Sequence, residues 1–81
     1  MIMDLWDFAA MMINETVMMA VDGDKAKADE VKLAFVLRYV LPEEQELVKE
    51  IQKNDPQRFD RLLAKIGEEY VVEFQDYLKS L

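Results

Sequence analysis

The first helix-sized run of the chain, residues 1–21, is apolar around nearly all of its circumference. A helix turns by about 100° per residue, which places the acidic and amide residues of this run in one narrow stripe with Asp22, the acid that follows it. The stripe consists of Asp4, Asp7, Asn14, Glu15 and Asp22. Such a helix must lie at the centre of its own fold or be buried in part by another chain. A chain of 81 residues has little protein with which to wrap it. The uncovered side therefore favours a homodimer, or a larger assembly, built mainly through this helix.

The remaining positions of this run form a broad apolar arc. Its members are Ile2, Leu5, Trp6, Phe8, Ala9, Met12, Ile13, Val17, Met19 and Ala20. Because apolar positions on a helix usually face the core, we expect Met12 and Met19 to be buried. We expect Trp6, on the centre of the arc, to be a core anchor rather than a binding hot spot.

All six methionines lie within the first 19 residues, and two of them, Met11 and Met18, share the acidic stripe. Methionine is flexible and polarisable, and it is frequent on surfaces that adapt to a partner. The sequence therefore predicts a docking strip for a basic or apolar protein surface. Its residues are Asp4, Asp7, Met11, Glu15, Met18 and Asp22. The alternative is that another helix, or a symmetry mate, covers the two methionines.

The charge of the chain excludes several kinds of partner and location. The formal net charge is −7, and residues 1–24 contain no Lys or Arg, so we expect no direct binding to nucleic acid. Asp4 and Asp7 stand where a signal peptide would be basic, and the polar residues of the run argue against a membrane span. We therefore expect a soluble, cytoplasmic protein. Without cysteine, its stability must come from packing.

Turn signals divide the rest of the chain. Asp22-Gly23-Asp24 predicts a left-handed residue at Gly23 and an N-terminal cap at Asp24. Pro42 predicts a third helix from Glu43 to about Lys53, and Asn54-Asp55-Pro56 predicts a further cap and helix start. Within residues 24–32, three lysines alternate with three acids, which predicts a salt-bridged helix face.

Two segments allow alternatives. Residues 31–41 alternate as a strand would, but no other run offers a pairing partner, so we predict a buried helix over residues 25–41. An intermolecular strand is the alternative. Apolar residues recur at helical spacing without a shift over residues 56–79, which predicts one continuous helix. A break at Gly67 is the alternative.

These elements predict an all-α domain that spans residues 1–81 and resembles a small four-helix bundle. Its two apolar N-terminal helices form a hairpin, which two amphipathic C-terminal helices cover on one side.

The composition also limits the chemistry. There is no His or Cys, no glycine-rich phosphate loop and a single serine next to the C-terminus. We expect no catalytic residue, cofactor or bound metal. Two acidic pairs, Glu43-x-x-Glu46 and Glu73-x-x-Asp76, are similar to the pattern of all-helical MazG-like nucleotide pyrophosphatases, whose carboxylates hold Mg²⁺. This resemblance implies an alternative, a Mg²⁺-dependent hydrolase with the ligands Glu43, Glu46, Glu73 and Asp76.

The first functional hypothesis is a non-enzymatic, acidic interaction module, an adaptor or inhibitor of another protein. Its acidic ends would steer it toward a basic surface. If that surface normally holds nucleic acid, the protein would inhibit by charge mimicry, as small viral antagonists do. A structural subunit of a larger complex is the remaining alternative.

Overall fold

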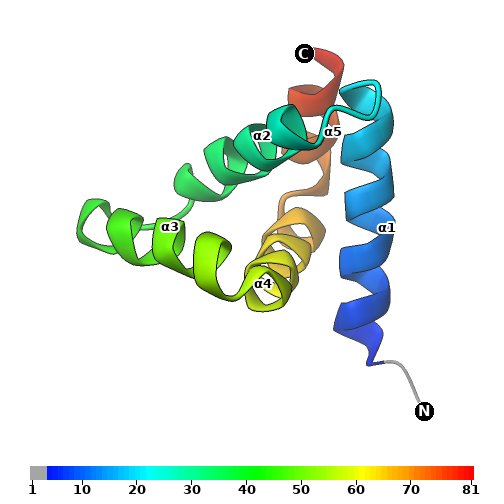
Figure 1. Ribbon diagram of the computed structural model, residues 1–81. Helices are drawn as coiled ribbons and strands as arrows, with labels where there is room; N and C mark the ends of the chain where they lie inside the picture. Colours follow the sequence, from blue (N-terminus) through cyan, green and yellow to red (C-terminus); the bar gives the residue numbers. More distant parts are fainter. Residues whose placement is uncertain (1–3) are drawn as a thin grey trace.

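The computed structural model describes residues 4–81, and all the regular structure in this range is helical. The elements are α1 (Leu5–Ala20), α2 (Lys25–Leu37), the 3-10 turn η1 (Pro42–Glu44), α3 (Gln45–Asn54), α4 (Pro56–Glu69) and α5 (Val71–Lys79). In Figure 1, α4 lies between α1 on one side and α3 on the other. The all-α prediction is confirmed, but the described residues form five α-helices rather than four.

Local capping sets where the helices begin. Oδ1 of Asp24 accepts a hydrogen bond from the Lys27 amide at 3.1 Å, and Oδ1 of Asp55 accepts one from the Arg58 amide at 3.3 Å. Gly23, with φ at +78°, provides the predicted left-handed residue between α1 and α2. These contacts involve only near neighbours in sequence, and the predicted caps at Asp24 and Asp55 and the left-handed Gly23 are confirmed. The third α-helix begins at Gln45, two residues later than predicted.

The second helix ends four residues earlier than the sequence predicts. It stops at Leu37, and Leu41 is extended, with φ at −69° and ψ at +151°. The ring of Pro42 excludes Leu41 from the helical region, and a 3-10 turn rather than an α-helix follows at once. Residues 31–37 are helical, so the strand alternative is wrong there.

The predicted continuous last helix is also wrong, because the chain changes direction at Tyr70. Tyr70 ends α4 with φ at −117° and ψ at +48°, and β-branched Val71 and Val72 begin α5. The break does not lie at Gly67, which remains inside α4. The Tyr70 ring stacks on Tyr39, with centroids 4.2 Å apart. An aromatic contact with a distant helix therefore accompanies the break.

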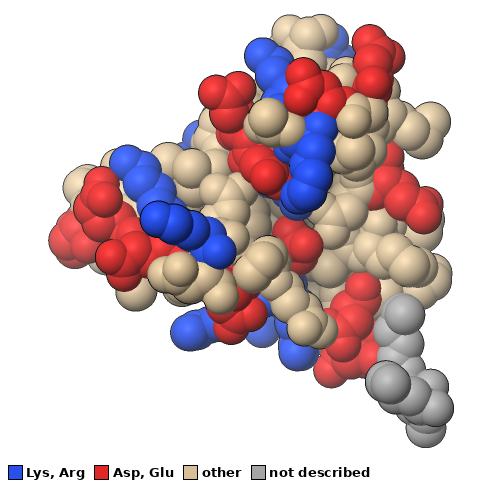
Figure 2. Space-filling model, viewed as in Figure 1, with Lys and Arg blue, Asp and Glu red and all other residues tan. Residues whose placement is uncertain are grey.

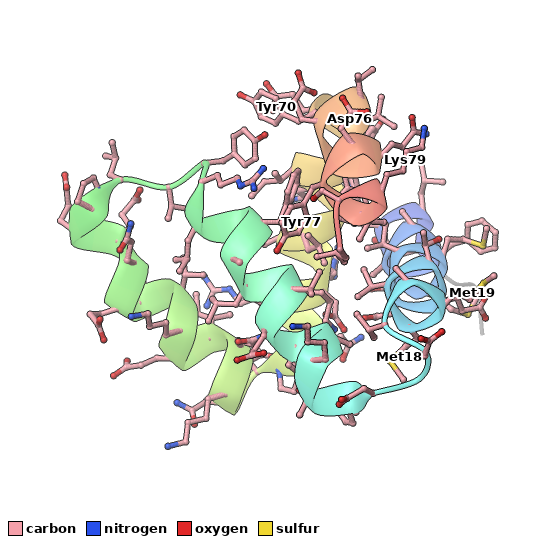
Figure 3. All side chains as sticks on the ribbon, turned by 90° about the horizontal axis from the view of Figure 1, so that it is seen from above. Met18, Met19, Tyr70, Asp76, Tyr77 and Lys79 are labelled. Atoms are coloured by element: carbon pink, nitrogen blue, oxygen red, sulfur yellow. The ribbon has the colours of Figure 1, made fainter. Side chains whose placement is uncertain are left out.

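The change of direction places α5 on α2. The buried Phe35 ring contacts the rings of Phe74 and Tyr77, with centroids 4.8 and 5.6 Å away, and the Tyr77 hydroxyl donates to the Val31 carbonyl at 3.2 Å. The guanidinium of Arg38 lies 4.5 Å from the centre of the Tyr77 ring. Figure 3 shows Tyr77 between the two helices.

The core lies around α4, which contacts α1, α2, α3 and α5. Its side chains Phe59 and Leu63 are almost completely buried, together with Val17, Phe35 and Val36. The first helix packs more extensively on α4 than on α2. The predicted arrangement, an N-terminal hairpin covered on one side, is not confirmed: α1 and α2 contact each other, but α1 packs mainly on α4.

A buried ammonium group connects three helices. Nζ of Lys32 on α2 donates to Asn14 Oδ1 on α1 at 2.6 Å and to Asp60 Oδ1 on α4 at 3.1 Å. The amide of Asn14 in turn donates to Asp60 Oδ2 at 2.9 Å. Asp29 lies 3.8 Å from the same ammonium and 3.7 Å from Lys25, so the predicted salt bridges on this helix exist. Lys32, however, is buried rather than on a solvated face.

This network predicts unequal effects of removing its two charges. Asp60→Leu leaves a buried ammonium without its closest counter-charge, and we expect a loss of about 2–4 kcal/mol in unfolding free energy. Lys32→Met leaves a carboxylate that still accepts from Asn14, and we expect a loss of about 1 kcal/mol or less. Urea titrations followed by circular dichroism measure both, and the double variant should recover most of the Asp60→Leu loss. A Lys32→Met loss equal to or larger than that of Asp60→Leu would contradict this account.

Candidate functional site

The polar stripe of α1 faces the protein in part, rather than solvent alone. Arg61 on α4 lies 3.4 Å from Asp4 Oδ2 and 3.7 Å from Asp7 Oδ1, and Asn14 joins the Lys32 network. Oδ1 of Asp7 is buried and accepts no hydrogen bond from the described residues. The rotation of α1 about its axis is therefore set by charges and amides that meet α4 and α2.

This rotation turns an apolar stripe outward. Leu5 is 76% exposed, Phe8 49%, Met12 48% and Met19 80%, while Ala10 and Val17 on the other side of the helix are buried. We call these four exposed residues the outward stripe. They follow one another at intervals of three, four and seven residues, which is the spacing of a coiled-coil seam. That spacing is present in the sequence and could have identified the stripe.

The methionines lie differently from the prediction. Met12 and Met19, expected in the core, are exposed, and Met18, expected on the surface, is half-buried and packs against the core. Figure 3 shows Met19 pointing away from the body of the molecule, whereas Met18 lies near the α1–α2 turn. Met11 is exposed, as the predicted docking strip requires. Met18 packs against the core because the Lys32 network turns the side of α1 that carries Asn14 and Met18 toward α2 and α4.

A groove runs beside the outward stripe, between α1, α4 and α5. Its volume is about 420 Å³, and α1 contributes Leu5 and Met12 to its wall while α5 contributes Val71 and Leu78. Gly67 forms part of the floor, and a Cβ there would lie 3.2 Å from the Ile13 side chain. The absent side chain therefore lets α1 and α4 approach closely. This groove is not visible in the sequence, because it depends on the direction of α5 after Tyr70.

Trp6 lies in this groove rather than in the core. Its side chain is half-buried, and Lys65 Nζ lies 5.6 Å from the ring centroid. The prediction that Trp6 is a core anchor is wrong, because α1 turns the Trp6 side chain toward the groove between α1, α4 and α5. A half-exposed tryptophan in an apolar groove is suited to contact a partner.

The other predicted partner-binding residues lie beside the outward stripe. Glu15 and Met11 line a shallow recess of about 310 Å³ together with Asp7. Asp22 is exposed in the turn after α1, with φ at +54°. Asp4 is exposed and caps α1 by accepting from the Trp6 amide at 2.7 Å. The structure thus places five of the predicted residues at or near the surface of α1, and Met18 against the core.

Charge is distributed unevenly over the surface. The edge formed by α1, at the right of Figure 2, shows acidic and uncharged atoms, whereas Lys and Arg gather over the centre and left. This agrees with the sequence, in which residues 4–24 contain five acids and no Lys or Arg. The outward stripe therefore lies in an acidic part of the surface.

The acidic pairs of the hydrolase alternative do not form a metal site. Glu43 lies in η1, Glu46 in α3 beside Lys49, and Glu73 and Asp76 in α5. Within residues 4–81, no group of three or more carboxylates is placed to hold a metal ion. Nor is any helix in this range long and apolar enough to span a bilayer.

The chain matches no protein-family model, and comparisons with curated proteins and with solved structures give no match either.

The reversed positions of the methionines predict a difference in stability. Met18→Lys places a charge against the core, and we expect a loss of about 1–3 kcal/mol, or a melting temperature lower by about 4–24 °C. Met12→Lys changes an exposed side chain of the same type on the same helix, and we expect a change within about 0.5 kcal/mol. Thermal unfolding of both variants measures the difference. Equal losses would show that the rotation of α1 described here is wrong.

Proposed function

We propose that the protein is a non-enzymatic, acidic interaction module, an adaptor or inhibitor that binds another protein through the outward face of α1. The observation that carries the proposal is the outward stripe, which a single copy of the chain leaves exposed. Contiguous apolar patches of this kind on small proteins are frequently binding sites.

Burial of the outward stripe would supply part of the free energy of binding. Complete burial of one apolar side chain contributes about 1.5–3 kcal/mol, so covering the exposed parts of the outward stripe would contribute roughly 4–8 kcal/mol. The entropic cost of association takes up much of this amount. Contacts beyond the stripe, with the groove and with the flanking carboxylates, are therefore needed for a stable complex.

The chemistry of the face supports a basic and apolar partner surface. Three exposed methionines, Met11, Met12 and Met19, can adapt their shape to a partner. Acidic side chains beside them would speed the encounter with a basic surface and disfavour acidic ones. A basic surface that normally holds nucleic acid would be blocked by such a complex, which is how an inhibitor of this kind would act.

A homodimer through α1, expected from the sequence, remains a prediction. Two copies of this face would bring acidic residues together, because α1 contains no Lys or Arg with which to pair them. We therefore propose a different protein as the partner of this face, with a second copy of the chain as the alternative.

A capture experiment tests the function. The wild type, Leu5→Lys/Met12→Lys and the control Leu41→Lys/Leu47→Lys are each immobilised and exposed to an extract of the source cells, and retained proteins are quantified by mass spectrometry. Both variants replace two exposed apolar residues and add the same charge, but Leu41 and Leu47 lie away from α1. We expect a protein that the wild type and the control retain and that the α1 variant loses. Retention of the same proteins by all three would contradict the proposed function.

A further inference from the structure

The spacing of the outward stripe indicates the shape of its occupant. Leu5, Phe8, Met12 and Met19 occupy the positions of a heptad seam, and Glu15 occupies the remaining seam position between Met12 and Met19. A seam of this kind packs along a second helix. The side chains of the second helix enter the spaces between the side chains of the seam. A flat or irregular partner surface would not use this spacing.

The groove provides a second wall for such a helix. It lies alongside the stripe, and its floor is low at Gly67, where a side chain is absent. Val71 of α5, which is half-exposed, stands on the far side. A helix lying against α1 could therefore place one row of apolar side chains on the stripe and another in the groove.

The charges on both sides of this path are mostly negative. Glu15 lies within the seam itself, and Glu68 lines the groove on the α4 side. Within the described residues, neither Glu15 nor Glu68 forms an ion pair. Lys65, whose Nζ lies 5.6 Å from the centroid of the Trp6 ring, is a cation close to this residue of the groove. A helix with Lys or Arg next to its apolar row would form ion pairs with these carboxylates. A charged residue within a seam, such as Glu15, also fixes the register of the two helices.

We propose that this face binds a basic amphipathic helix of another protein, with its apolar side along the outward stripe and groove and a Lys or Arg opposite Glu15. The inference depends on the proposed function and specifies its partner. A second copy of the chain is the competing occupant. It fits less well, because α1 offers no basic residue to either Glu15.

Trp6, the single tryptophan of the chain, reports on the groove directly. Its fluorescence would be followed during titration with three tryptophan-free peptides of about 16 residues, the length of α1. The first peptide has leucines at heptad spacing flanked by lysines, and the second has glutamates in place of the lysines. The third has the composition of the first in a shuffled order without an apolar side. We expect the first peptide to bind at least about tenfold more tightly than the other two.

Two variants of the protein, each with a matched control, locate the binding. Leu5→Ser/Met12→Ser should weaken binding of the first peptide about tenfold, whereas Leu41→Ser/Leu47→Ser should leave it unchanged. Glu15→Lys should shift the preference toward the glutamate peptide. Glu50→Lys, which makes the same charge change at an exposed position of α3, should not.

Several results would overturn the inference. Equal binding of the lysine and glutamate peptides would remove the charge complementarity, and equal binding of the shuffled peptide would show attraction by net charge alone. Light scattering that shows a dimer, dissociated by Leu5→Ser/Met12→Ser, would assign the face to a second copy. If no peptide binds but the capture experiment still retains a protein through α1, this inference fails while the proposed function stands. If the capture also fails, both are wrong.

Discussion

The buried ammonium of Lys32 fixes how three helices, α1, α2 and α4, face one another. Its contacts with Asn14 on α1 and Asp60 on α4 join three helices through side chains that cannot be buried without partners. Rotating α1 by even one residue, about 100°, would break the contact with Asn14 and leave a buried charge less satisfied. The network therefore selects one rotation of α1 from several that its apolar surface alone would allow.

That selection explains how a helix apolar on nearly all sides can lie at the surface. The residues that α1 buries completely are the compact Ala10 and Val17, with Ile13 and Met18 packed in part against the core. The larger Leu5, Phe8 and Met19 remain outside. Apolar burial alone would favour the opposite arrangement, with the larger side chains inside. Polar contacts thus determine which apolar residues remain available to a partner.

The parts of the fold that the sequence predicts correctly are those set by near neighbours. The caps at Asp24 and Asp55 and the left-handed Gly23 need no knowledge of the rest of the chain. The break at Tyr70 and the burial of Met18 depend instead on contacts with residues distant in sequence, such as Tyr39. Helical periodicity shows that α1 has several apolar sides, but it does not show which of them the other helices cover.

The carboxylates beside the outward stripe have two opposite effects that follow from the same charge. They would repel a second copy of the face, and they would attract a basic helix. Added salt screens both effects, because Glu15 and Asp22 are exposed. Screening would therefore weaken a complex with a basic partner while it favours association between copies of the chain. The acidity of α1 thus opposes self-association through the large apolar surface of this helix, which an uncharged helix with the same stripe would not do.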